Sequence, residues 1–159
     1  MITFSADEVF EMAEEMERNG AKFYRKAAEA AAESSRDLLE RLAAMEDDHE
    51  KTFAAMRAEL SDRDRQPLTA DPDDTAVLYL QAMVDGKVFA ADPSEALTGA
   101  EPMDAVLNTA IGLEKDSIVF YEGMKAGVAG LAAEGKIQSI IRQEIGHIVD
   151  LTRQLRALA

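Results

Sequence analysis

Glu46-Asp47-Asp48-His49 and Glu144-Ile145-Gly146-His147 are two copies of one short motif, Glu-x-x-His. Residues three apart lie on the same face of an α-helix, so the glutamate and the histidine of each copy point in a common direction. The chain has two histidines, and both complete the motif. A glutamate-rich helical chain produces one such motif easily, but two from two histidines is a much rarer coincidence.

An internal repeat surrounds the two motifs. Residues 16–24 align without gaps with residues 113–121, which matches Glu17 with Glu114. In each half a tyrosine follows this glutamate by seven residues, and the Glu-x-x-His motif begins about thirty residues after it. The chain therefore consists of two similar halves.

The first half is expected to form a helical hairpin over residues 5–61. Strong helix formers dominate the composition, and Gly and Pro gather at a few places. Ser5 and Glu8 form a capping-box pattern that opens the first helix. Ser34 or Ser35 is expected to cap the second.

The second half is expected to form another hairpin, over residues 102–159. Pro102 suits the first turn of its first helix, and its second helix is expected from about Ala132. Residues 62–101 hold three of the four prolines and form a long crossover with a shorter helix at about 74–91. Two short connections and one long one predict a single all-α domain, a four-helix bundle of the ferritin-like arrangement.

Apolar residues recur every three or four positions along each predicted helix, and this spacing defines the inward stripes. The four repeat glutamates and both histidines fall on these stripes, near the middle of their helices. The other residues expected to face inward are Phe10, Ala13, Gly20, Tyr24, Ala27, Leu39, Leu42, Phe53, Met56, Leu60, Leu107, Ala110, Ser117, Tyr121, Met124, Val128, Ile137, Ile140, Leu151 and Leu158.

Six polar side chains in an apolar interior require compensation. Burying an unpaired carboxylate costs several kcal/mol, and four converging carboxylates also repel one another. Protons could relieve this, but two divalent cations balance four glutamates, and each histidine adds a neutral nitrogen. Di-iron bundles use this set: one Glu from each of two helices and Glu-x-x-His from each of the others. The predicted metal ligands are Glu17, Glu46, His49, Glu114, Glu144 and His147.

Tyr24 and Tyr121 lie two helical turns after Glu17 and Glu114 on the same faces. They are either core aromatics whose hydroxyls need some partner or neighbours of the metal that hold a ligand carboxylate or take part in redox chemistry. Gly20 and Ser117 are small, which leaves room beside the ligands for a bound oxidant.

Composition excludes several other classes of protein. The formal net charge of −14 opposes binding to nucleic acid. It indicates a solvated acidic surface or carboxylates that attract cations. The chain has no cysteine, which excludes disulfides, thiolate metal sites and iron–sulfur centres within it. With neither a signal-peptide pattern nor an apolar stretch that could span a membrane, we expect a cytoplasmic protein.

These motifs resemble those of the rubrerythrin and ferritin-like di-iron family over nearly the whole chain. The resemblance rests on the Glu-x-x-Gly-x-x-Phe-Tyr run that ends at Tyr24, on its copy ending at Tyr121, and on both Glu-x-x-His motifs. It implies that Glu17 and Glu114 are the ligands from the first and third helices. Glu46 and Glu144 would be bridging or chelating carboxylates, and the histidines terminal nitrogen ligands.

The same resemblance implies two iron ions per chain, with hydrogen peroxide or oxygen as substrate, and a homodimer or larger homo-oligomer. Manganese or zinc could substitute, since carboxylate and imidazole ligands suit these metals too. The chain lacks the cysteine-rich rubredoxin domain of full rubrerythrins, so electrons would come from an external donor such as a rubredoxin-like protein. The additional glutamate of the peroxidase members is also not evident after Glu114, where residues 115–117 are Lys-Asp-Ser.

Three functions are compatible with a two-metal centre in a helical bundle. The first, which we favour, is a di-iron oxidoreductase that reduces peroxide or oxygen. The second is an iron-handling protein that oxidises, stores or releases iron. The third is a non-catalytic helical interaction module in which metal holds the core together.

Overall fold

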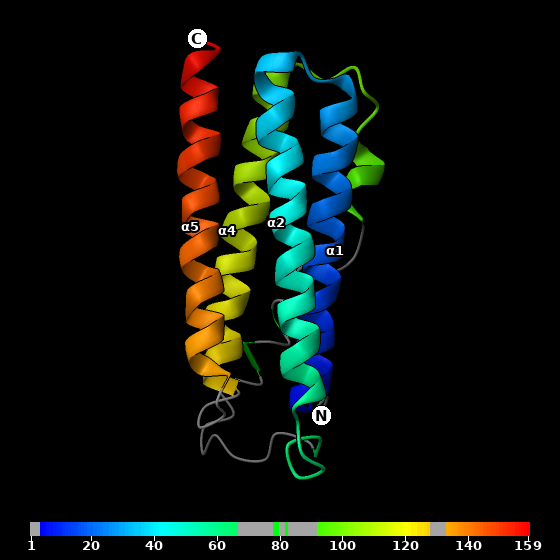
Figure 1. The fold of residues 1–159 in the computed structure, drawn as a ribbon, viewed down its shortest axis with the longest axis vertical. Helices are drawn as coiled ribbons and strands as arrows, with labels where there is room; N and C mark the ends of the chain where they lie inside the picture. Colours follow the sequence, from blue (N-terminus) through cyan, green and yellow to red (C-terminus); the bar gives the residue numbers. More distant parts are fainter. Residues whose placement is uncertain (1–3, 67–77, 80–81, 83–91, 128–132) are drawn as a thin grey trace.

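The computed structural model describes residues 4–66, 78–79, 82, 92–127 and 133–159. Four long helices dominate the described chain: α1 (Ala6–Ala30), α2 (Glu33–Ala58), α4 (Met103–Gly127) and α5 (Glu134–Ala157). They lie side by side as two hairpins, with the chain termini at opposite ends of the bundle (Figure 1). The prediction of an all-α, ferritin-like four-helix bundle is confirmed.

The two hairpins are joined by a long crossover between the end of α2 and the start of α4. Within it, a 3₁₀ helix, η1 (Pro93–Ala96), packs against α1. The chain then passes over the end of the bundle to begin α4 (Figure 1). The predicted short helix at 74–91 lies outside the described residues, except for Leu78, Tyr79 and Ala82, which are helical.

Local sequence sets the start of α1. The Ser5 side chain accepts a hydrogen bond from the backbone N–H of Glu8, and the Glu8 carboxylate accepts one from the backbone N–H of Ser5. This is the predicted capping box, and it satisfies two donors at the helix end that would otherwise lack partners.

Two predicted boundaries are wrong. α2 begins at Glu33, so neither Ser34 nor Ser35 caps it. Ser35 is buried instead and accepts a hydrogen bond from Gln154 of α5, 3.0 Å away. Pro102 precedes α4 rather than lying in its first turn, and its carbonyl accepts the first helical hydrogen bonds, from Ala105 and Val106.

The buried core consists of two apolar clusters with a gap between them. One contains Phe10, Phe53, Tyr121 and Ile137, and the other contains Tyr24, Leu39, Leu107 and Leu151. Most residues predicted to face inward belong to one of the two. Leu158 is an exception: it lies just beyond the end of α5 and is 43% exposed, so its predicted burial is wrong. Val128 lies outside the described residues.

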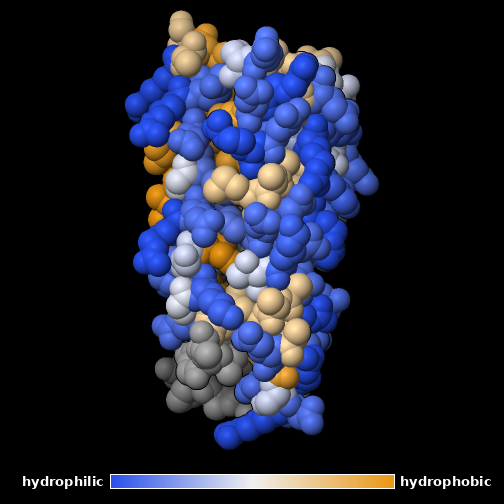
Figure 2. All heavy atoms as spheres, in the orientation of Figure 1, coloured by the Kyte–Doolittle hydropathy of each residue, from blue (hydrophilic) through white to orange (hydrophobic). Residues whose placement is uncertain are grey.

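The face of the molecule in Figure 2 is mostly hydrophilic, with a few apolar patches among the polar side chains. None of the described helices is both long and apolar enough to cross a membrane.

Candidate metal centre

The six predicted ligands fill the gap between the two apolar clusters. Each helix contributes from its middle: Glu17 from α1, Glu114 from α4, and the two Glu-x-x-His motifs from α2 and α5. All six side chains are buried, with at most 4% of any residue exposed. The inward stripe of each helix therefore changes from apolar to ligand-type residues for about one turn, and the four helices bring these turns to one level.

The cluster divides into two overlapping groups whose candidate ligand atoms lie within 4.8 Å of one another. We call the group with His49 the His49 half-site; it contains Glu17, Glu46, His49 and Glu144. The group with His147 is the His147 half-site; it contains Glu46, Glu114, Glu144 and His147. Glu46 and Glu144 belong to both, so they are the carboxylates that could bridge two ions.

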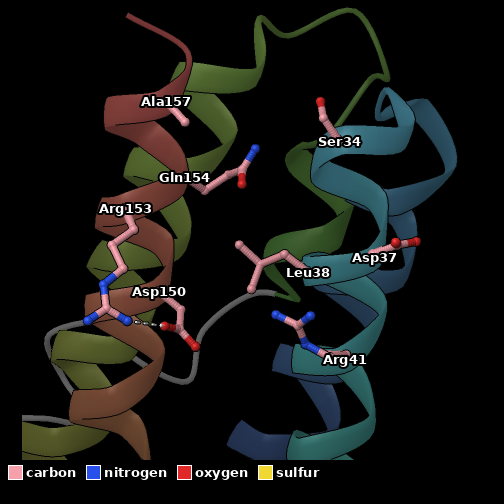
Figure 3. Close-up of a pocket in the computed structure, with 8 residues that line it drawn as sticks. All are labelled: Ser34, Asp37, Leu38, Arg41, Asp150, Arg153, Gln154 and Ala157. Carbon is pink, nitrogen blue, oxygen red and sulfur yellow. Dashed lines mark hydrogen bonds and ion pairs between the residues drawn. The ribbon is translucent and has the colours of Figure 1, made fainter.

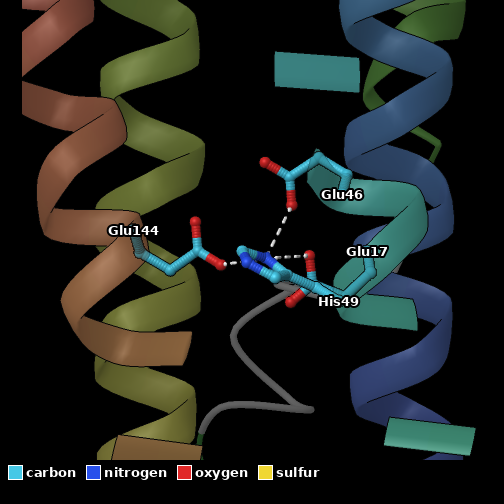
Figure 4. A group of neighbouring side chains, drawn as sticks. All are labelled: Glu17, Glu46, His49 and Glu144. Atoms are coloured by element: carbon cyan, nitrogen blue, oxygen red, sulfur yellow. Dashed lines mark ion pairs between the residues drawn. The ribbon is translucent and has the colours of Figure 1, made fainter. Parts of the chain in front are cut away.

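In the His49 half-site, ring nitrogen Nδ1 of His49 faces the carboxylates of three helices (Figure 4). It lies 2.8 Å from Oε1 of Glu144, and 3.6 Å from Oε2 of both Glu17 and Glu46. These groups converge from α1, α2 and α5 on one small volume.

The His147 half-site repeats this geometry. Nδ1 of His147 lies 2.9 Å from Oε2 of Glu144, 3.2 Å from Oε1 of Glu46 and 3.4 Å from Oε1 of Glu114. Each shared carboxylate thus presents one oxygen to His49 and the other to His147. The two imidazole rings stack with their centroids 5.6 Å apart.

The cluster contains buried polar atoms without hydrogen-bond partners among the described residues. They are Oε1 of Glu46, both carboxylate oxygens of Glu144, Nδ1 of His49, and both ring nitrogens of His147. Buried polar groups of folded proteins are nearly always satisfied. Carboxylate oxygens and imidazole nitrogens are also the donor set that iron, manganese and zinc accept. The residues present therefore fit a pair of divalent metal ions.

Electrostatics separate the four glutamates into two kinds. Burial raises the pKa of Glu17 and Glu114 well above the usual carboxyl value, and the charge of neighbouring glutamates raises it further. Burial also opposes ionisation of Glu46 and Glu144. Contact with the Glu17 carboxyl, and then with the two histidines, outweighs burial and lowers the pKa of Glu46, and contact with the histidines lowers the pKa of Glu144.

The histidines complete the charge balance. Burial lowers the pKa of His147, but the surrounding carboxylates of Glu114, Glu144 and Glu46 outweigh burial and raise it to about 12. The pKa of His49 is likewise raised, against burial, by its carboxylate neighbours. Without a cation, the imidazolium ions of His49 and His147 balance the carboxylates of Glu46 and Glu144, while Glu17 and Glu114 hold protons. Two divalent cations and four carboxylates reach the same neutrality, so cations can replace protons without leaving a buried net charge.

Two tyrosines connect the halves of the cluster crosswise. The Tyr24 hydroxyl of α1 donates a hydrogen bond to Oε1 of Glu114 on α4, and the Tyr121 hydroxyl of α4 donates to Oε1 of Glu17 on α1. Both tyrosines are almost completely buried. Sequence spacing associated each tyrosine with the glutamate of its own helix, whereas the hydroxyl contacts the glutamate of the other hairpin.

Gly20 lies against the Glu46 side chain of the cluster. A Cβ atom added to Gly20 would lie 3.4 Å from Cγ of Glu46, which is ordinary contact with little space to spare. Ser117, the residue aligned with Gly20, is half-buried, and its hydroxyl donates to the backbone carbonyl of Leu113.

Sequence analysis missed Gln143. Its Oε1 atom lies 3.1 Å from Nε2 of His49, the ring nitrogen that faces away from the cluster. The sequence signal for Gln143 was its position directly before the predicted ligand Glu144. Gln143 lies on the exposed side of α5, however, and the inward stripes did not include it.

A surface pocket of about 490 Å³ lies nearer the chain's C-terminal end, between α2 and α5 (Figure 3). Its lining includes Arg41, Arg153 and Asp150, and the last two form an ion pair of 3.2 Å. None of the six cluster residues lines it, so it is separate from the candidate metal centre.

Fold and cluster together define a class: a ferritin-like four-helix bundle with a buried carboxylate–histidine cluster suited to two metal ions. The rubrerythrin family profile matches residues 8–155. The chain therefore belongs to the rubrerythrin family, which confirms the resemblance inferred from its motifs.

A solved structure supports the fold. The crystal structure of a Thermotoga maritima protein, described as a ferritin-like diiron-carboxylate protein, superposes with a TM-score of 0.74. The two sequences are 23% identical, and the alignment covers 100% of this chain and 99% of the other. No curated protein matches the chain.

Proposed function

We propose that the protein binds two iron ions between the six clustered side chains and reduces hydrogen peroxide or oxygen with electrons from an external donor. The observation that carries this proposal is the convergence of four buried carboxylates and two imidazoles, whose candidate ligand atoms form two groups within 4.8 Å of one another. A cluster with only a structural role would not need four mutually repelling carboxylates at one place.

The position of each residue in the cluster would set its role. Glu46 and Glu144 offer one oxygen to each half-site and would bridge the ions. The His49 half-site would be completed by Glu17 and His49, and the His147 half-site by Glu114 and His147. The hydroxyls of Tyr24 and Tyr121 would hold the outer glutamates in place.

Iron supplies the redox chemistry, exchanging electrons with an oxygen-based substrate. Reduction of one hydrogen peroxide to two waters consumes two electrons and two protons. Since the chain has no cysteine for a thiolate-bound iron centre of its own, the electrons would come from another molecule, such as a rubredoxin-like protein.

Stopped-flow mixing tests this function. Protein reconstituted with Fe(II) under anaerobic conditions is mixed with peroxide or with oxygen, and optical absorption is followed over time. We expect rapid oxidation, followed by re-reduction when an electron donor is added. Uptake of many more than two ions per chain would instead indicate iron handling, and tight binding with no response to either oxidant would indicate a non-catalytic module.

We further propose a homodimer or larger assembly in the cytoplasm. Ile145 and Val149, one turn apart on α5, are 49% and 42% exposed, and burial of such apolar side chains favours association. Light scattering coupled to size-exclusion chromatography tests the assembly; a monomer at all concentrations would contradict it.

A further inference from the structure

The two half-sites differ in the hydrogen-bond partner of the histidine Nε2 atom. Nδ1 of each histidine faces the shared carboxylates. Nε2 of His49 lies 3.1 Å from Oε1 of Gln143. Nε2 of His147 is buried, and no hydrogen-bond partner for it occurs in the described part of the chain.

The internal repeat explains this difference. Aligning Glu144 with Glu46 places Gln143 opposite Met45. In the repeat, Met45 is the counterpart for His147 of what Gln143 is for His49. Met45 carries a thioether, which is a weak acceptor, in place of an amide oxygen. The sequence itself makes the two halves unequal.

The contact between Gln143 and His49 has a defined direction. Because Nδ1 of His49 faces the cluster, where a cation would require its lone pair, the ring proton must lie on Nε2. Nε2 then donates, and Oε1 of Gln143 accepts. Such a bond fixes the tautomer and the ring orientation of a metal-binding histidine and makes its other nitrogen a stronger donor.

We propose that Gln143 is a positioning residue for His49, and that it makes the His49 half-site bind metal more tightly than the His147 half-site. This inference rests on the dinuclear centre of the proposed function. It adds that the two ions bind in order, with the His49 half-site filled first.

Zinc titration against a chromophoric chelator tests the inference without any turnover. For the wild type we expect two stepwise constants that differ by about 10-fold or more, since loss of a partner of this kind typically weakens metal binding 10- to 100-fold. Gln143→Met, which copies the other half, should weaken the tighter constant by about 10-fold and bring the two constants close together. Gln143→Glu keeps an acceptor and should keep them apart.

The chain offers a matched control and a converse variant. Gln154 also reaches from α5 to α2, where it donates to Ser35 at 3.0 Å. Gln154→Met makes the same chemical change away from the cluster and should leave both constants unchanged. Met45→Gln should tighten the weaker constant.

Long-range ¹H–¹⁵N spectra of the zinc-loaded protein give a second readout. With two histidines in the chain, each ring can be assigned. We expect the Nε2 proton of His49 to be protected from exchange in the wild type and to lose that protection in Gln143→Met.

The outcomes separate this inference from the proposed function. Wild-type protein that binds two zinc ions, with constants that Gln143→Met does not change, overturns the role of Gln143 and leaves the dinuclear centre intact. Equal losses in Gln143→Met and Gln154→Met overturn it as well. Wild-type protein that takes up no zinc contradicts the metal centre itself, and this inference with it.

Discussion

Tyr24 and Glu114 lie 90 residues apart in the sequence, and the hydroxyl of one donates a hydrogen bond to the buried carboxylate of the other. The aligned pair, Tyr121 and Glu17, makes the reciprocal bond. Each hairpin therefore orients a carboxylate that belongs to the other. The cluster is complete only when both hairpins have docked.

Tyr24→Phe should destabilise the metal-free protein by about 1–3 kcal/mol, since it leaves a buried acceptor on Glu114 without its donor. Urea unfolding monitored by circular dichroism measures the change. Tyr121→Phe is the matched variant and should cost a similar amount. Unchanged midpoints in both variants would show that the hydroxyls do not hold the carboxylates.

His49→Ala and Glu46→Ala should differ in metal content. His49 belongs to one half-site, so its loss should leave about one ion per chain bound. Glu46 belongs to both, so Glu46→Ala should weaken both half-sites, and the double variant should bind no more than Glu46→Ala alone. Elemental analysis after desalting measures the ratio, and helical circular dichroism verifies that the bundle remains folded. Wild-type occupancy in these variants would refute the ligand assignment.

Asp7 gives a pH-dependent contribution to stability that is independent of the cluster. A hydrogen bond from Arg57, 2.9 Å away, lowers the pKa of Asp7 in the folded protein, despite some opposing burial. The stabilisation is therefore fully present above the unfolded pKa of about 3.9 and is lost as pH falls through the lower folded value.

Asp7→Asn should accordingly cost up to about 1 kcal/mol at pH 7, with the difference from wild type shrinking as the pH falls below about 4. Parallel denaturant titrations at several pH values measure it. Glu11 also pairs with Arg57, but its own side chain is 62% exposed. Glu11→Gln should therefore destabilise the protein less than Asp7→Asn does. A cost for Asp7→Asn that is the same at low and neutral pH would contradict the assignment.

Gly20 tests the space beside the cluster. Gly20→Ala removes a helix-destabilising glycine and makes only ordinary contact with Glu46, so it should stabilise the fold by about 0.5–1 kcal/mol. Gly20→Leu should push the Glu46 side chain aside and reduce metal uptake. Thermal unfolding and metal analysis of both variants measure these effects; full metal content in Gly20→Leu would show that the space is not limiting.

The sequence was sufficient for features that local rules or helical periodicity determine. The Ser5–Glu8 cap follows from side chains three residues apart, and the inward direction of Glu46 and His49 follows from the apolar residues on their stripe. The internal repeat added the relation between the hairpins, because each half carries the same three ligands, two glutamates and one histidine.

Features that depend on the distances between helices could not be predicted in this way. Periodicity places Tyr24 on the face of Glu17 but does not say which helix lies opposite, so the bond to Glu114 was not foreseen. Gln143 lies on an exposed part of α5, and its contact with His49 depends on how closely α5 packs against α2. Ser35 satisfies the sequence rule for a helix cap, but it is buried against Gln154 once the hairpins pack.

The metal-to-protein ratio tests the central claim most directly. Wild-type protein reconstituted anaerobically with Fe(II), desalted and analysed for iron should contain about two ions per chain, one for each half-site. A ratio near zero after careful reconstitution would contradict the account, because the buried carboxylates would then have to be compensated by protons alone.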